Sequence, residues 1–285
     1  MEIQPNRKRD DTMKLGIISG PDEQGFQYVR RFGLDTTEFC INVNHDAKAV
    51  AARAQEIKGY CGQYGVFVAS VGRWGTQRVT AEGFNQEEYE QDLALIGLAQ
   101  AIGCPHFTCG CNRVEGMPFI ENAQLAVRYF RALTDYAAPR GVKILVYNCD
   151  WGNIIHDKRG WDIVLPQVPG LGIKYDTSHC INRDGDVLRE MMDYGQYIGH
   201  FHVKGTVRVN GENIPDPPAG LDDVPWGAVM AMLYTHGYDG ALNLEPHSRV
   251  WSEGPRGDWG IRFTIDMMRK YIISGQSEGQ GAYMP

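Results

Sequence analysis

The sequence predicts a single α/β domain of the (β/α)₈ TIM barrel class, and three observations support this. Eight short apolar segments alternate with eight longer amphipathic segments along the 285 residues of the chain. Several of the short segments contain almost no polar residue, as expected for parallel strands covered on both faces. The turn after the first predicted strand, residues 19–22, lacks the glycine pattern of a dinucleotide-binding fold. A closed barrel is therefore favoured over an open doubly wound sheet.

The predicted elements follow one another in regular order. Strands are expected over residues 14–19, 37–43, 66–71, 106–109, 143–148, 172–176, 198–203 and 241–245. Helices are expected over residues 24–32, 45–60, 86–102, 120–138, 161–165, 187–194, 226–236 and 258–273. Leu93, Ile96 and Ala99, for example, recur at helical spacing. The barrel should span residues 14–275, between a flexible N-terminal tail (1–13) and a C-terminal tail (276–285).

Composition limits the classes of partner. The formal net charge of −7 disfavours binding to nucleic acid and to anionic membrane surfaces. No apolar run approaches the ~18 residues that span a membrane. The seven cysteines form an odd set without metal-site spacing, and the N-terminal segment is polar, so we expect reduced thiols and a cytoplasmic location. A homo-oligomer is conceivable through outer helices such as residues 120–138.

Ionisable residues gather at the ends of the last three strands, where barrel enzymes place their active sites. His200, His202 and Lys204 alternate with Phe201 and Val203 in the seventh strand. Because side chains alternate between the two faces of a strand, the apolar pair suits contact with the outer helices. The two histidines and the lysine should therefore face the barrel axis.

Two carboxylates should lie beside these side chains. Asp176 ends the sixth strand and Glu245 ends the eighth. Two buried carboxylates next to the His202 imidazole are unstable without a compensating cation. Such ligands suit a divalent metal ion, Mn²⁺, Mg²⁺, Co²⁺ or Zn²⁺. The alternative is a salt-bridge network in which Lys204 and a protonated His179 neutralise both carboxylates.

Four ordered motifs carry a family resemblance. They are Asp176–Thr–Ser–His179, Gly199–His–Phe–His202 with Lys204, Val224–Pro–Trp226, and Gly237–Tyr–Asp–Gly240 leading to Glu245–Pro246. With them the chain resembles the xylose isomerase-like sugar isomerases and epimerases. That group includes ketose 3-epimerases, hydroxypyruvate isomerase, inosose dehydratase and relatives of endonuclease IV. A nuclease function like that of endonuclease IV is disfavoured, because strands two to four offer too few metal ligands and the chain is acidic.

The resemblance implies one metal held by a Glu, an Asp, a His and a Glu from strands five to eight. Asp176, His202 and Glu245 match the last three of these ligands. The fifth strand departs from the pattern, because Tyr147 stands at the position of the Glu. Asn148 is then the candidate fourth ligand.

Other ways to complete the site stay open. Asp150 or the Tyr147 hydroxyl could also reach the metal, or water could fill the position. A further alternative is that the site has lost its metal.

Further site residues follow from the resemblance and from position. His179 and Arg208 match a histidine and an arginine that contact substrate in the family. His200 faces the axis and is a candidate substrate contact. Trp74 follows the third strand, where its ring could stack on a sugar or simply be half-buried in a loop.

These residues predict a metal-dependent isomerase or epimerase that removes a proton α to the carbonyl of a keto-sugar or related polyol. Glu245 is the candidate base, and His179, Lys204 or Tyr147 the candidate acid. The alternatives are a lyase or dehydratase on the same barrel, and a non-catalytic sugar-binding barrel. The partner is a small-molecule sugar in each case.

Overall fold

The computed structural model describes residues 13–273. The predicted tail segments 1–12 and 276–285 lie outside the described residues. Met13, which we assigned to the N-terminal tail, is buried in the core next to the first strand. No helix within residues 13–273 is both long and apolar enough to cross a membrane.

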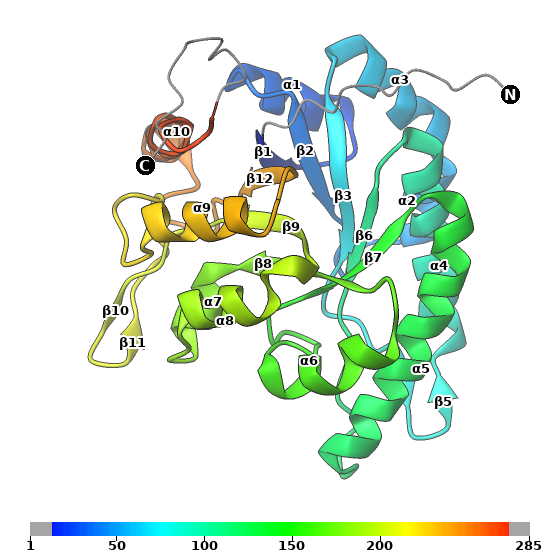
Figure 1. Ribbon diagram of the computed structural model, residues 1–285. Coiled ribbons are helices and arrows are strands. Elements are labelled where there is room, and N and C mark those ends of the chain that lie inside the picture. The colour runs from blue at the N-terminus through cyan, green and yellow to red at the C-terminus, as the bar shows by residue number, and fades with distance from the viewer. Residues whose placement is uncertain (1–12, 274–285) are drawn as a thin grey trace, which may run out of the picture.

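Eight parallel strands close into a barrel, which confirms the predicted (β/α)₈ fold (Figure 1). In chain order they are β1 (Lys14–Ser19), β2 (Thr36–Cys40), β3 (Phe67–Arg73), β6 (His106–Cys109), β7 (Lys143–Tyr147), β8 (Gly172–Asp176), β9 (Ile198–Val203) and β12 (Ala241–Leu244). Pairing of β1 with both β2 and β12 closes the cylinder. Late strands β8, β9 and β12 therefore lie side by side, and β2 is separated from them only by β1.

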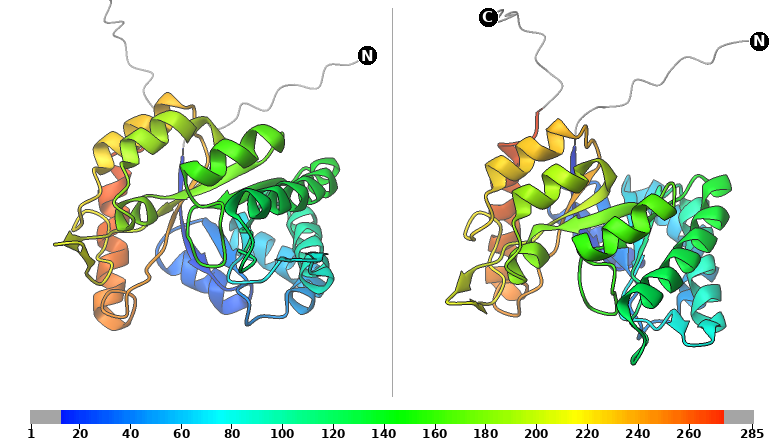
Figure 2. Two further views of the ribbon diagram at one scale, coloured as in Figure 1. Left: turned by 90° about the horizontal axis from the view of Figure 1, so that it is seen from below. Right: turned by 60° about the horizontal axis from the view of Figure 1, so that its bottom comes forward.

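Helices surround the strands (Figure 2). They are α1 (Glu23–Arg31), α2 (Ala47–Ala52), α3 (Ala54–Tyr64), α4 (Gln86–Ile102), α5 (Phe119–Ala137), α6 (Lys158–Val164), α7 (Thr177–Asn182), α8 (Val187–Tyr194), α9 (Trp226–Thr235) and α10 (Gly254–Arg269). Short 3₁₀ turns follow α5, α6 and α8 at Ala138–Arg140, Leu165–Gln167 and Gly195–Tyr197. Two small hairpins lie in loops: β4 (Val79–Thr80) with β5 (Gly83–Phe84), and β10 (Arg208–Val209) with β11 (Glu212–Asn213).

The structure divides one predicted helix and adds another helix near the site. The single helix expected over residues 45–60 is divided into α2 and α3 at Arg53. Helix α7 was not predicted; it begins immediately after β8, where Oδ1 of Asp176 accepts a hydrogen bond from the Ser178 backbone N–H at 2.8 Å. An aspartate at this position is a strong N-cap, so the carboxylate both starts a helix and faces the barrel mouth.

The barrel interior is unusually polar for this fold, whose inner layers are normally filled by branched apolar residues. Glu38, Lys174, His200 and Asn243 are buried there almost completely. The apolar core lies instead between the strands and the helices, where Phe39 and its neighbours are enclosed. Buried charged groups inside the cylinder need partners of opposite charge, so they are expected to form ion pairs with one another.

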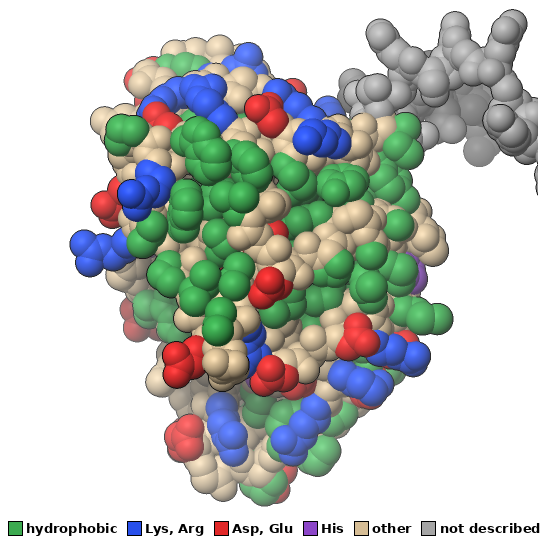
Figure 3. Space-filling model, turned by 90° about the vertical axis from the view of Figure 1, so that its left-hand side faces the viewer, with side chains coloured by type: hydrophobic (Ala, Val, Ile, Leu, Met, Phe, Trp, Pro, Cys, Tyr) green, Lys and Arg blue, Asp and Glu red, His purple; other side chains and the backbone are tan. Residues whose placement is uncertain are grey.

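One side of the molecule carries exposed apolar side chains over α9, α10 and the β10–β11 hairpin (Figure 3). Trp259, Val209, Leu221, Val250 and Ile214 are each at least 41% exposed there or in the adjoining loops. Exposed apolar groups of this kind are commonly interaction surfaces. The predicted homo-oligomer stays a prediction, for which this face is a candidate in addition to α5, where Ile120 is exposed.

Candidate active site

A cavity of about 530 Å³ opens at the mouth of the barrel, where the strands end. Its lining includes charged or imidazole side chains from β8, from α7, from β9 and from the residues that follow β9 and β12: Lys174, His179, His202, Lys204, Glu245 and His247. Apolar and aromatic groups, including Trp74 and Trp151, complete the wall. The predicted placement of the polar residues at this end of the barrel matches the position of the cavity.

The three predicted metal ligands meet at its floor. Donor atoms of Asp176, His202 and Glu245 all lie within 4.8 Å of one another. Oδ1 of Asp176 accepts hydrogen bonds from the backbone and the hydroxyl of Ser178, at 2.8 and 2.7 Å. Oδ2 of the same carboxylate is buried and has no hydrogen-bond partner. An orphaned buried oxygen costs free energy unless a cation approaches it.

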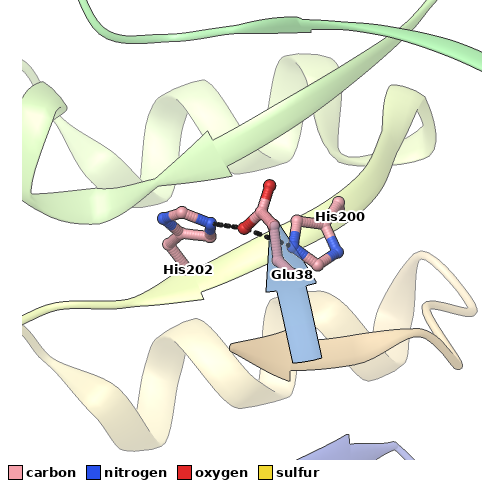
Figure 4. A group of neighbouring side chains, drawn as sticks. All are labelled: Glu38, His200 and His202. Atoms are coloured by element: carbon pink, nitrogen blue, oxygen red, sulfur yellow. Dashed lines mark hydrogen bonds and ion pairs between the residues drawn. The ribbon is translucent and has the colours of Figure 1, made fainter. Parts of the chain in front are cut away.

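His202 is held between two carboxylates, one of which the sequence analysis did not assign to this site. Its Nδ1 lies 2.8 Å from Oε2 of Glu245, and its Nε2 makes a short hydrogen bond with Oε2 of Glu38 (Figure 4). His200 Nε2 approaches the same Glu38 oxygen at 3.1 Å. Glu38 comes from β2 and is completely buried. Its only sequence signal is an acidic residue inside an otherwise uncharged strand.

The pKa values of this group reflect that arrangement. Burial favours neutral forms, but the two histidines outweigh it and hold the pKa of Glu38 well below its usual value. Burial likewise opposes a charged His202, yet Glu38 and Glu245 raise its pKa. The carboxylate of Glu38 is an acceptor for a proton on Nε2 of His202. That leaves Nδ1 on the cavity side, as in carboxylate-supported metal-binding histidines.

Two lysines stand beside the three ligands. Lys174 of β8 is buried, and its Nζ lies 3.8 Å from Oδ2 of Asp176. Nζ of Lys204 lies 3.9 Å from Oδ2 of Asp216. Burial by itself would lower the pKa of Lys204, but Glu245, Asp176 and Asp216 together raise it, so this lysine is charged. Lys174 was missed although it is two residues before Asp176 and therefore faces the same side of the strand.

His179 is neutral in this environment. Its Nε2 lies 3.5 Å from Oδ2 of Asp176, which favours the charged ring. Burial together with the ammonium groups of Lys204 and Lys174 outweighs that carboxylate and lowers the pKa of His179 to about 4. The lowered pKa of His179 argues against a protonated His179 in the salt-bridge alternative, whereas Lys174 and Lys204 can still pair with the carboxylates.

The candidates for the fourth ligand point elsewhere. The Asn148 amide is used by the backbone of Asp176, donating to its carbonyl at 2.8 Å and accepting from its N–H at 2.9 Å. The Tyr147 hydroxyl donates to the Trp151 carbonyl at 2.8 Å, and burial raises its pKa. Asp150 lines a neighbouring cavity. In this arrangement Asn148 and Tyr147 make hydrogen bonds that support the end of the strand.

Of the predicted substrate contacts, Trp74 lines the cavity, whereas His200 and Arg208 do not. Trp74 lines the cavity, and its ring stacks on Tyr147 with centroids 5.5 Å apart. His200 lies one inward position deeper than His202 on β9 and is sealed from the cavity. Arg208 is paired with Asp184 and donates to the Ile181 carbonyl at 2.9 Å, so it fastens the hairpin to α7 and does not line the cavity.

Asp176, His202 and Glu245 fit a divalent metal ion by donor chemistry, by the orphaned Asp176 oxygen and by the support that His202 receives. With the amide of Asn148 and the hydroxyl of Tyr147 engaged elsewhere, water would complete the coordination. The neighbouring charges of Lys174 and Lys204 balance the two carboxylate ligands. Such balance is expected to weaken metal binding relative to a site with an acidic excess.

Comparison with known proteins agrees with the architecture. The sequence pattern of the xylose isomerase-like TIM barrel family matches residues 26–271. A xylose isomerase domain protein from Planctomyces limnophilus superposes with a TM-score of 0.71 at 16% identity, covering 91% of this chain and 97% of that one. D-allulose 3-epimerase from Methylomonas sp. gives 0.73 at 17% identity, with 91% and 98% covered.

The 3-keto-D-glucoside 4-epimerase from E. coli gives a TM-score of 0.67 at 16% identity, with 90% of this chain and 99% of that chain covered. No curated protein sequence matches the chain significantly. Likeness at this level of identity establishes the fold, while the match over residues 26–271 establishes the family. The chain belongs to the xylose isomerase-like TIM barrel family.

Proposed function

We propose that the protein is a metal-dependent isomerase or epimerase that removes a proton α to the carbonyl of a keto-sugar or related polyol. The observation that carries the proposal is the meeting of Asp176, His202 and Glu245 donor atoms within 4.8 Å beside a cavity of about 530 Å³. Two solved structures with the same fold are named as sugar epimerases, one for D-allulose and one for a 3-keto-D-glucoside. Their names support the substrate class, and the site supports the chemistry.

Glu245 is the proposed base. Burial raises its pKa, but the charges of Lys204 and His202 outweigh burial and hold the pKa well below its usual value. The carboxylate is therefore ionised and able to accept a proton at neutral pH. A bound divalent metal would polarise the substrate carbonyl and stabilise negative charge on the neighbouring oxygens.

Lys204 is the proposed acid. It lines the cavity together with Glu245 and is protonated at neutral pH, so it has a proton to donate. His179 is neutral and better suited to hydrogen-bond a substrate hydroxyl than to donate a proton. Tyr147 is occupied by the Trp151 carbonyl. Of the three predicted acids, Lys204 thus has the strongest support.

One carboxylate base and one ammonium acid suit aldose–ketose isomerisation, and they equally suit elimination of water or of a glycosidic group. A symmetric epimerisation needs a second carboxylate base. It is less well supported, because Tyr147 stands at the position where the family has that carboxylate. A lyase or dehydratase is therefore the second candidate.

The test combines metal analysis with proton exchange. Purified protein and the Asp176→Ala variant are loaded with Mn²⁺ and desalted, and their metal content is measured. We expect about one bound ion in the wild type and loss of most of it in the variant. Asp266→Ala, at a position exposed on α10, is the control and should retain the metal. Equal metal content in wild type and Asp176→Ala contradicts the site.

The activity is then tested by measuring incorporation of solvent deuterium into each member of a panel of keto-sugars. Exchange that depends on Glu245 supports the isomerase or epimerase, and exchange with loss of water or of a leaving group supports the lyase. Sugar binding without exchange in any member of the panel indicates a non-catalytic barrel.

A further inference from the structure

A side cavity of about 280 Å³ opens next to the main cavity, and His179 lines both. Its walls come from the loop after β7, from α7 and its C-terminal end, and from β11. Every lining residue is polar or charged: Asn148, Asp150, His156, His179, Asn182, Arg183 and Asn213. The main cavity differs, since Ile18, Trp74 and Trp151 contribute apolar surface there. The side cavity is therefore suited to a ligand rich in hydrogen-bonding groups.

The charges of the side cavity favour a neutral ligand. Both oxygens of Glu190 accept from Nη2 of Arg183, at 2.7 and 2.8 Å, so the guanidinium is already neutralised. Burial lowers the pKa of His156, which is consequently uncharged near neutral pH. Asp150 adds negative charge at the wall and would repel an anion. A phosphate or carboxylate group would find no free cation among these residues.

Unused hydrogen-bonding groups remain in this cavity. Nδ1 of His156 is buried and has no hydrogen-bond partner. Oδ1 of Asn182 accepts from the Thr206 hydroxyl at 2.8 Å, which orients the amide and leaves its NH₂ group for a ligand. Asn213, at the exposed rim on β11, adds another amide. Donors and acceptors on neutral groups are what the hydroxyls of a sugar require.

We propose that the side cavity binds a second, neutral, hydroxyl-rich unit of the substrate, so that the enzyme acts on a keto-glycoside or keto-disaccharide in preference to a free monosaccharide. The inference rests on the proposed function, because the reacting unit is taken to lie in the main cavity. His179, which borders both cavities, lies where the two units would be joined. His156, Asn182 and Asn213 are then specificity-determining residues for the second unit.

The test compares a monosaccharide with larger sugars that contain it. The metal-loaded full-length protein is titrated by calorimetry with D-fructose and with turanose, maltulose, isomaltulose and leucrose, which attach a glucosyl unit at different fructose hydroxyls. We expect one or more of the disaccharides to bind at least about tenfold more tightly than D-fructose, as a few added hydrogen bonds allow. If D-fructose binds and every disaccharide binds equally or more weakly, the inference is overturned while the proposed function stands.

Variants localise the effect. Asn182→Ala and His156→Ala should each reduce the advantage of the preferred disaccharide by about three- to tenfold and leave D-fructose affinity unchanged. Asn213→Trp, at an exposed position that tolerates a large residue, should block the side cavity without affecting the fold. Lys58→Ala, exposed on α3, is the control.

Thermal unfolding of each variant verifies that it is folded. Disaccharide binding that all three cavity variants leave unchanged overturns the assignment of the second unit to this cavity. Absence of binding by D-fructose and every disaccharide counts against the proposed function itself, so the two failures are distinguishable.

Discussion

The Lys174 ammonium lies 3.8 Å from Oδ2 of Asp176, a ligand oxygen that no hydrogen bond satisfies. A cation built into the barrel floor thus stands close to the place that a metal ion would occupy. It neutralises part of the carboxylate charge that would otherwise attract the metal. The proposed metal site consequently contains a competing cation of its own.

Replacing Lys174 by methionine, which keeps the length of the side chain, is expected to raise the affinity for Mn²⁺. Removing a positive charge a few ångströms from the ion should improve binding by about ten- to a hundredfold. Calorimetric titration of the metal-free protein measures the change. Lys143→Met, at the opposite end of the barrel on β7, serves as the control. Unchanged affinity in Lys174→Met would show that the ammonium does not oppose the metal.

Glu38→Gln is expected to weaken Mn²⁺ binding by about ten- to a hundredfold, because the carboxylate orients His202 and increases its basicity. The substitution should also lower the pKa of His202, which Glu38 raises. Calorimetry gives the affinity, and NMR titration of the imidazole in the metal-free protein gives the pKa. Glu56→Gln, exposed on α3, is the matched control. A pKa and an affinity that both stay at the wild-type values would exclude this supporting role.

Lys204→Met should reduce turnover by about 10²- to 10⁴-fold on the keto-sugar that exchanges its proton with solvent, since a positioned acid contributes this much. His179→Asn should have a smaller effect, because the neutral imidazole is not the proton donor. Lys158→Met, at an exposed position on α6, controls for the loss of a charge. The assignment of the acid is reversed if His179→Asn is the more damaging change. Product formation and deuterium incorporation are measured in parallel.

Acid should destabilise the fold through His106. Burial, together with His200, lowers the pKa of His106 to about 4 from 6.5. The unfolded chain binds a proton below pH 6.5 while the folded chain does not, so stability present above pH 6.5 is lost as the pH falls toward 4. Urea unfolding at pH 7.5 and 5.0 measures this loss.

His106→Asn keeps a donor for the Ala69 carbonyl, which lies 3.0 Å from Nδ1 of the histidine. It should reduce the loss of unfolding free energy between the two pH values by about 2 kcal/mol. The exposed His45→Asn variant should behave as wild type. An identical pH dependence in His106→Asn would mean that other groups cause the acid sensitivity.

The sequence by itself determined the barrel and one side of the site. Alternation along β9 placed His202 and Lys204 on the inner face, because successive side chains of a strand point in opposite directions. Asp176 and Glu245 were predicted at the ends of the strands on either side of β9, and their donor atoms lie close to that of His202. Strand boundaries were within a few residues, and four strands matched without correction.

Only the tertiary structure decided which side chains meet across the barrel. Glu38 reaches His202 because closure through β1 brings β2 near β9, which no local pattern reveals. Lys174 shares a face with Asp176, yet its distance from Oδ2 depends on the register shift between β8 and β9 and on its rotamer. Period fixes the side of a strand on which a residue lies, whereas closure, register and rotamer fix the atoms it touches. The proposed metal ligands followed from the period, whereas the positions of Glu38 and Lys174 beside them followed from closure, register and rotamer.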